Sequence, residues 1–149
     1  CVVYSGDNPL ACRPLVRLGP LRYSHRCNTP MVQLHSSHAA IFGKLEYISP
    51  GGSGKERSGV GRIERAERAG LVKRGGTIIE PTAGNTGIGL ALAGVQMGYR
   101  VLLCVPENFS IEKREVRRAI GGEVDLTPKD EGMKGAIAKA DEWQKASPN

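Results

Sequence analysis

A chain of 149 residues is long enough for one domain that buries roughly 68–70% of its unfolded surface, but too short for two full domains. Hydrophobic residues make up 40% and charged residues 24%, as in ordinary globular proteins, and no apolar run approaches the ~20 residues that span a bilayer. These values argue against a membrane protein.

The net charge of +6 is unevenly distributed. Residues 1–26 carry four arginines and one aspartate, so half of the excess lies in that segment. Prolines at positions 9, 14 and 20 oppose an amphipathic helix there, and we predict that the segment adds little to the core. Elsewhere basic and acidic residues alternate, as in residues 64–68, which is typical of a solvated helix face. No nucleic-acid partner is therefore expected.

Residues 1–40 are expected to form an irregular N-terminal segment, in which only 31–34 could be a short strand. From residue 41 to residue 149, short apolar runs alternate with helical patterns, which is typical of β-α-β units. The predicted fold class is α/β, a parallel sheet with covering helices in three layers. The predicted strands are residues 41–47, 77–80, 100–105 and 123–127.

Helices are expected between these strands. The first begins near Ser53, buries Val60, Ile63 and Ala66, and stops at Gly70. A small-residue helix covers 87–98, and Ser110 caps a charged helix that ends at Ala119. The last helix is predicted to start after a cap at Asp130 and to bury Met133, Ile137, Ala140 and Trp143.

The four cysteines, Cys1, Cys12, Cys27 and Cys104, include no Cys-x-x-Cys pair. Neither a disulfide scaffold nor a zinc site is expected, and no other metal ligands are assigned. Cys104 lies within an apolar run, so we predict a buried and inert thiol.

Two loops stand out as candidates for chemistry. Residues 50–57 read Pro-Gly-Gly-Ser-Gly-Lys-Glu-Arg, and residues 81–89 read Pro-Thr-Ala-Gly-Asn-Thr-Gly-Ile-Gly. The first is not a nucleotide-binding P-loop, because Ser49 stands at the position of the first glycine and Glu56 follows Lys55. The second lacks the last glycine of a dinucleotide fingerprint. A lysine amine can react with an aldehyde cofactor, and a Gly-Asn-Thr loop can bind a carboxylate.

At these loops the chain resembles the cysteine synthase and cystathionine β-synthase family. Residues 44–57 (KLEYISPGGSGKER) and 75–91 (GGTIIEPTAGNTGIGLA) carry the likeness. Further matches follow the family's order at 28–34 (NTPMVQL), 105–107 (VPE), 126–128 (LTP) and 131–140 (EGMKGAIAKA). The sequence departs from the family at Cys27, Gly54, Glu56, Ser58 and Ala83.

The resemblance implies the smaller domain of a fold-type II enzyme that uses pyridoxal 5'-phosphate. It implies that Lys55 is the catalytic lysine, which forms the Schiff base with the cofactor, and that Asn85 also contacts the cofactor. It further assigns Thr82, Gly84, Asn85 and Thr86 to the carboxylate of a small amino-acid substrate. The implied reaction is β-replacement on O-acetylserine or a related activated serine, in cysteine biosynthesis.

Family members are homodimers, and the cytoplasm is the expected compartment, with an organelle left open. The resemblance places the phosphate-binding segment in a second half that does not follow Asn149 in this sequence. We therefore expect the 149 residues alone to be a truncated enzyme that is weakly active or inactive. The alternative is a non-catalytic binding or regulatory domain that keeps the fold without the cofactor.

Overall fold

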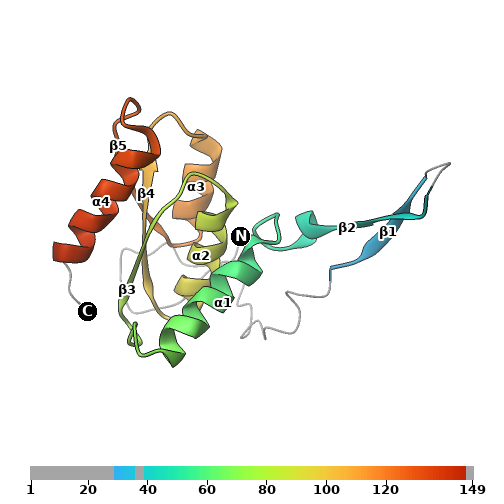
Figure 1. Cartoon of the computed structure of the whole chain (residues 1–149), viewed down its shortest axis with the longest axis horizontal. Coiled ribbons are helices and arrows are strands. Elements are labelled where there is room, and N and C mark those ends of the chain that lie inside the picture. The colour runs from blue at the N-terminus through green and yellow to red at the C-terminus, as the bar shows by residue number, and fades with distance from the viewer. Residues whose placement is uncertain (1–28, 36–38, 147–149) are drawn as a thin grey trace.

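The computed structural model describes residues 29–35 and 39–146. The predictions for residues 1–26, and for Cys1, Cys12 and Cys27, lie outside these ranges. A three-stranded parallel sheet forms the centre of the molecule, in the order β3-β4-β5 (Figure 1). Its strands are β3 (Thr77–Pro81), β4 (Arg100–Pro106) and β5 (Glu123–Thr127). The predicted α/β class, with its parallel pairing of the strands at 77 and 101, is confirmed.

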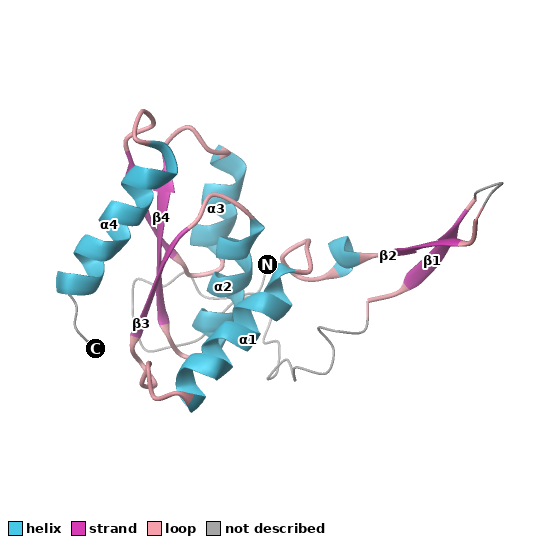
Figure 2. Ribbon diagram, viewed as in Figure 1, coloured by secondary structure: helices cyan, strands magenta, loops and turns pink. Residues whose placement is uncertain are grey.

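Helices cover both faces of this sheet (Figure 2). On one face lie α2 (Asn85–Gln96) and α3 (Ile111–Ala119), and α4 (Gly132–Ala146) covers the other. A further helix, α1 (Lys55–Arg68), packs on the outer side of α2. The three-layer arrangement follows because a tight turn cannot join parallel strands, so each crossover carries a helix across a face of the sheet.

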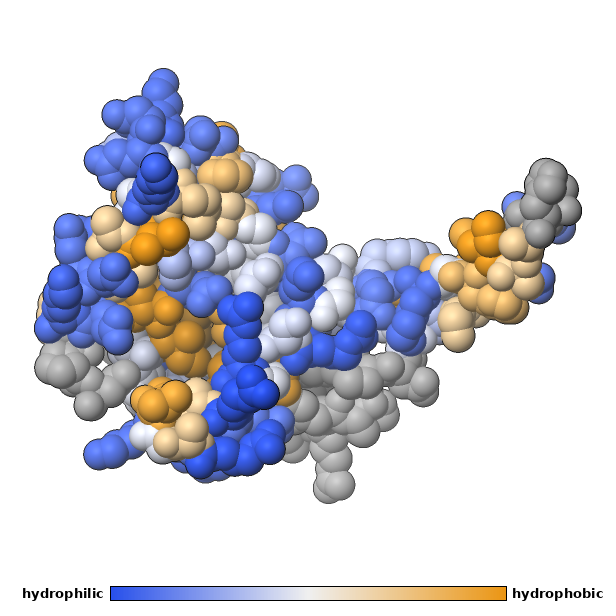
Figure 3. Space-filling model, in the orientation of Figure 1, coloured by the Kyte–Doolittle hydropathy of each residue, from blue (hydrophilic) through white to orange (hydrophobic). Residues whose placement is uncertain are grey.

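The first predicted strand does not belong to the parallel sheet. Instead, β2 (Ile41–Lys44) pairs antiparallel with β1 (Met31–Leu34), and the chain continues into a short 3-10 helix, η2 (Glu46–Ile48). This hairpin extends away from the body in Figure 1. Several of its apolar side chains are exposed, including Met31 and Phe42, and Figure 3 shows apolar surface along it. Each of its strands finds a partner in the other, so the hairpin forms without joining the sheet.

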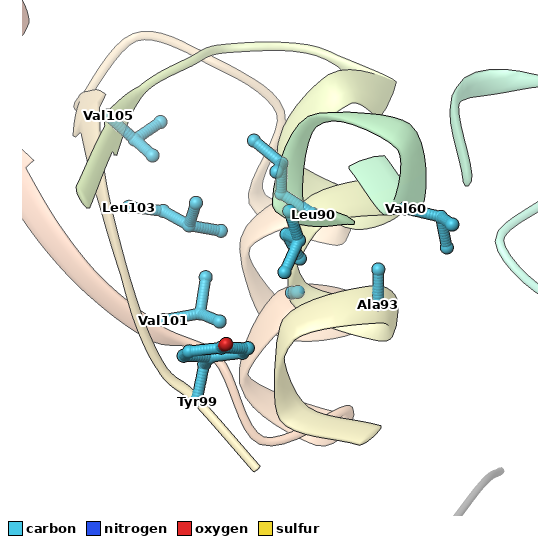
Figure 4. Close-up of a cluster of buried hydrophobic side chains, with 9 residues drawn as sticks. Val60, Leu90, Ala93, Tyr99, Val101, Leu103 and Val105 are labelled. Atoms are coloured by element: carbon cyan, nitrogen blue, oxygen red, sulfur yellow. The ribbon is translucent and has the colours of Figure 1, made fainter. Parts of the chain in front are cut away.

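The main core lies between the sheet and α2, with α1 behind it (Figure 4). Successive side chains of a strand point to opposite faces, so Val101, Leu103 and Val105 of β4 face α2. Leu103 and Val105 are completely buried. Cys104, between them, faces α4 instead and packs with Ala136 and Ala140. The central strand thus serves two cores.

The helix signals of the sequence are confirmed at most ends. Ser110 Oγ accepts a hydrogen bond from the Lys113 N–H at 3.4 Å, as expected for an N-cap. Gly70 follows α1 with φ +67°, a conformation that only glycine adopts without strain. The cap expected at Asp130 is wrong, because α4 starts two residues later at Gly132.

The apolar face predicted for α4 is wrong at one position. Met133, Ala140 and Trp143 pack towards the sheet, as does Ala136, but Ile137 is 48% exposed. Positions three and four apart share a helix face, and Ile137 lies one residue, about 100°, beyond Ala136. The small Ala136 allows the helix to approach β4, and this contact decides which face is buried.

Cys104 gives a prediction for high pH. Burial, with a smaller contribution from the Asp125 charge, raises the pKa of its thiol to about 11. The folded state therefore holds this proton more tightly than the unfolded state. The stabilisation that the protonated thiol gives to the fold is complete below pH ~9 and is lost as the pH rises to about 11. The loss should amount to up to about 2 kcal/mol of unfolding free energy. Denaturant melts between pH 8 and 11 should show that the unfolding free energy of the wild type falls more steeply with pH than that of Cys104→Ala. Equal falls in the two proteins would contradict the prediction.

Candidate functional site

The loop of residues 50–54 is fixed against α2. Glu56, in the first turn of α1, is 3% exposed and accepts a hydrogen bond from the Gly51 N–H. A Cβ at Gly51 would lie 2.9 Å from the Leu92 side chain and 3.0 Å from the Ile88 side chain, so a larger residue would have to displace side chains of α2. Lys55 is the first residue of α1, and its side chain is exposed. The loop thereby presents the amine at a fixed helix start.

Glycines allow α1 and α2 to touch through their backbones. A Cβ at Gly59 would lie 2.6 Å from the Gly89 carbonyl oxygen, and a Cβ at Gly89 would lie 2.5 Å from the Lys55 carbonyl oxygen. Gly89 is four residues, or about 6 Å along the axis, from Asn85 at the start of α2. The backbone of Lys55 therefore lies within about one helical turn of the position where α2 begins.

Residues 82–84 connect β3 to α2, and together with the first two residues of α2 they form the second candidate segment, the 82–86 loop. Thr82 is buried, and its N–H donates to the Cys104 carbonyl at 3.1 Å, which continues the sheet pairing by one residue. Gly84 is the N-cap of α2 and makes no side-chain cap, and Asn85 and Thr86 form the first turn. The first N–H groups of a helix have no intrahelical partner and lie at its positive end. This helix start can therefore bind an anion such as a carboxylate.

The base of the hairpin is tied to the start of α1. Glu46 forms an ion pair with Arg57 at 2.9 Å and accepts a hydrogen bond from Thr29 Oγ1 at 3.0 Å. The hydrogen bond from Arg57 is the main cause that lowers the pKa of Glu46. A Cβ at Gly54 would lie 2.9 Å from Glu46 Oε2, so a larger residue beside Lys55 would require this ion pair to shift.

Arg117 of α3 lies behind the 82–86 loop, and sequence reasoning missed it. Its side chain is completely buried, and Nη2 donates to the Gly84 carbonyl oxygen at 2.8 Å. Nε and Nη1 have no hydrogen-bond partner among the described residues. Burial lowers the pKa of this guanidinium. A spacing signal existed, since Lys113, Arg117 and Ile120 share a face, but the charged side chains on it resemble a solvated surface.

The structure thus brings all the residues singled out from the sequence towards one region. Thr82, Gly84, Asn85 and Thr86 form one continuous loop and helix start, and Lys55 starts the neighbouring helix. The carboxyl edge of the sheet does not bring Lys55 to this region, because the strand before its loop belongs to the hairpin rather than to the sheet. The glycine contact between α1 and α2 brings it there instead.

The donor set suits an aldehyde cofactor with an anionic amino acid beside it. Lys55 offers an exposed amine that forms no ion pair with any described residue, and the start of α2 offers N–H donors for a carboxylate. Within residues 29–35 and 39–146, no three His, Cys, Asp or Glu side chains are placed to share a metal ion. Over the same ranges, none of the helices has the length and apolar composition needed to cross a bilayer.

Comparison with known proteins gives consistent matches. The family model described as pyridoxal-phosphate dependent enzyme matches residues 23–149. A cysteine synthase of Flavobacterium sp. is 50% identical over 125 residues, which is 82% of this chain and 41% of that protein. An O-acetylserine dependent cystathionine beta-synthase of Bacillus subtilis is 48% identical over 76% of this chain and 38% of its own length. The chain therefore spans about two fifths of these relatives.

Solved structures agree with the sequence matches. The cystathionine beta-synthase of Bacillus anthracis superposes with a TM-score of 0.70 at 55% identity, covering 82% of this chain and 48% of that one. The cysteine synthase of Entamoeba histolytica gives 0.75 at 38% identity, over 82% of this chain and 38% of that one. The likeness to cysteine synthases and cystathionine β-synthases is confirmed, and the chain belongs to the family of pyridoxal-phosphate dependent enzymes.

Proposed function

We propose that this chain supplies the lysine and the carboxylate loop of a cysteine-synthase-like enzyme. The observation that carries the proposal is the backbone contact between α1 and α2 at Gly59 and Gly89, which holds Lys55 beside the start of α2. The reaction we propose is β-replacement on O-acetylserine or a related activated serine. When bound, pyridoxal phosphate supplies the electron sink that allows a group on the β-carbon to leave and another to replace it.

Lys55 is the proposed catalytic residue. Its Nζ would hold the cofactor's aldehyde carbon until substrate binds, and would then carry a proton to and from the substrate. The rigid 50–54 loop favours this role, because Glu56 and the Gly51 contact fix the start of α1 and so limit the positions that Nζ can reach.

The 82–86 loop would hold the substrate carboxylate. The N–H groups at the start of α2 favour negative charge, and Thr82 and Thr86 add hydroxyl groups. Asn85, at the same helix start, is the residue we assign to the cofactor ring as well. A carboxylate bound there would fix the orientation of the amino acid towards Lys55.

The remaining assignments are also proposals. We divide the chain into an irregular segment, 1–40, and an α/β domain, 41–149, although the hairpin includes residues from both sides of this boundary. A homodimer and a cytoplasmic location are proposed by likeness to the family. Because the matched relatives are more than twice as long, we propose that the phosphate is held by a part of the enzyme outside the matched region.

A labelling experiment tests the role of Lys55. Pyridoxal phosphate is added to the 149-residue chain, the lysine-bound cofactor is trapped with borohydride, and the modified peptides are mapped. We expect weak labelling that favours Lys55 over Lys73, an exposed lysine in the turn before β3, because the backbone of Lys55 contacts α2 at Gly89, one helical turn from the proposed carboxylate site. Lys55→Ala should abolish this preference, and Lys73→Ala should leave it intact.

Other outcomes would change the proposal. Tight, stoichiometric labelling of Lys55 would show that no further segment is required to hold the phosphate. Diffuse labelling that Lys55→Ala leaves unchanged would favour a non-catalytic binding domain instead.

A further inference from the structure

We propose that Arg117 is a positioning residue for the carboxylate that residues 82–86 bind: it orients the Gly84–Asn85 peptide from behind, and its buried charge strengthens anion binding. The inference rests on the proposed function of that loop, and it adds a group that lies outside both sequence motifs.

The hydrogen bond to Gly84 determines which way the loop peptide points. The Gly84 carbonyl oxygen accepts from Arg117 Nη2 at 2.8 Å and from the Gly87 N–H at 3.2 Å. The carbonyl of Gly84 and the N–H of Asn85 belong to one planar trans peptide, in which they point in opposite directions. Because Arg117 holds the Gly84 carbonyl, the Asn85 N–H is directed to the opposite side of the loop, where a carboxylate can accept a hydrogen bond from it.

The guanidinium is held firmly in this place. A Cβ at Gly87 would lie 3.1 Å from Arg117 Nε and 2.5 Å from the Thr82 methyl group. The absence of that carbon at Gly87 leaves the space in which Thr82 and Arg117 approach each other. Because the side chain is completely buried, the guanidinium cannot turn out to solvent without opening this contact.

The charge of Arg117 is not neutralised by a carboxylate among the described residues. Two of its three guanidinium nitrogens lack a hydrogen-bond partner there, and the group lies at the positive end of α2. A buried cation without a counter-ion is unfavourable, and the helix dipole adds to that cost. An anion on the other side of the Gly84–Asn85 peptide would offset both effects. Carboxylate binding should therefore depend on Arg117 without direct contact.

The experiment follows the amide signals of Asn85 and Thr86 by NMR while L-serine is added to the folded chain. L-serine methyl ester, which has the same amine and hydroxyl but no carboxylate, is the ligand control. Three variants are compared. Arg117→Met removes the charge and the donors, Arg117→Lys keeps the charge, and Arg118→Met removes an exposed charge from the next position, where Arg118 pairs with Glu115.

We expect Arg117→Met to weaken L-serine binding by about fivefold or more, from the loss of a unit charge at short range in a partly buried site. Arg117→Lys should recover a substantial part of the affinity, and Arg118→Met should stay within about twofold of the wild type because solvent screens its charge. Should Arg117→Met fail to fold, Arg117→Gln takes its place, since it keeps a donor for Gly84 but lacks the charge.

Two failures are distinguishable. Equal responses to L-serine and its methyl ester in the wild type would overturn the carboxylate role of the loop, and the inference with it. Selective binding of L-serine that Arg117→Met or Arg117→Gln leaves unchanged would overturn the role of Arg117 alone. If Arg117→Lys lost as much affinity for L-serine as Arg117→Met, the charge at position 117 would not be what strengthens carboxylate binding.

Discussion

Gly59→Ala is expected to lower the free energy of unfolding by about 2 kcal/mol, because overpacking a tight contact costs about 1–3 kcal/mol. The new Cβ would lie 2.6 Å from the Gly89 carbonyl oxygen and 3.0 Å from the Leu90 nitrogen. Both are backbone atoms of a buried helix, so they cannot rotate away as a side chain could. The helices must separate, and Lys55 then moves away from the start of α2. Urea denaturation followed by circular dichroism measures the loss.

Gly61→Ala is the matched control for this prediction. Gly61 lies in the same helix, two residues further on, and apart from the neighbouring backbone of α1 no atom lies within 4 Å of the position that a Cβ would take. Alanine is the better helix former by up to about 1 kcal/mol, so this variant should be unchanged or more stable. If Gly59→Ala matched Gly61→Ala, the backbone contact between α1 and α2 would not hold the site together.

Leu103→Ala is expected to lower the free energy of unfolding by about 3 kcal/mol, within the range of large-to-small substitutions in cores. Leu103 is completely buried at the centre of β4, between α2 and the other apolar side chains of the main core. Its removal leaves a cavity under α2, the helix that follows residues 82–84. Chemical denaturation of the variant and the wild type gives the difference directly.

Leu71→Ala provides the comparison for the same chemical change. Leu71 is 75% exposed in the turn after α1, so its truncation should alter stability by no more than about 0.5 kcal/mol. A Leu103→Ala variant as stable as Leu71→Ala would mean that β4 is not the centre of the core.

The parallel strands could be predicted from the sequence because their signals are local. Residues 101–105 form an unbroken apolar run, and the predicted strands at 77–80 and 123–127 match β3 and β5 to within one residue. The cap at Ser110 and the stop at Gly70 were equally readable, since each depends on the chemistry of one residue and its near neighbours. The residues of the candidate site were also found this way, through two short motifs.

Errors arose where a contact between distant segments decided the outcome. The predicted strand at 41–47 has an ordinary strand pattern, but its residues 41–44 pair with residues 31–34 and not with the parallel sheet. Ile137 has the right residue type for a core, but Ala136 and Ala140 make the closer approach to β4 and turn it to solvent. A pattern read along one segment cannot show which neighbour that segment will meet.

The sequence by itself determined the α/β class and three of the strands, and its two short motifs supplied the lysine and the loop of the proposed site, because each depends on residue types at short spacing. Only the tertiary structure decided how α1 and α2 meet, through the contact of Gly59 with Gly89, and that Arg117 lies buried behind Gly84. In α3 the apolar Ile111 is exposed while Arg117 is buried, so hydropathy alone does not identify the buried face of this helix. The physical reason is that burial is a property of the packed surroundings, which residues far apart in the chain create together.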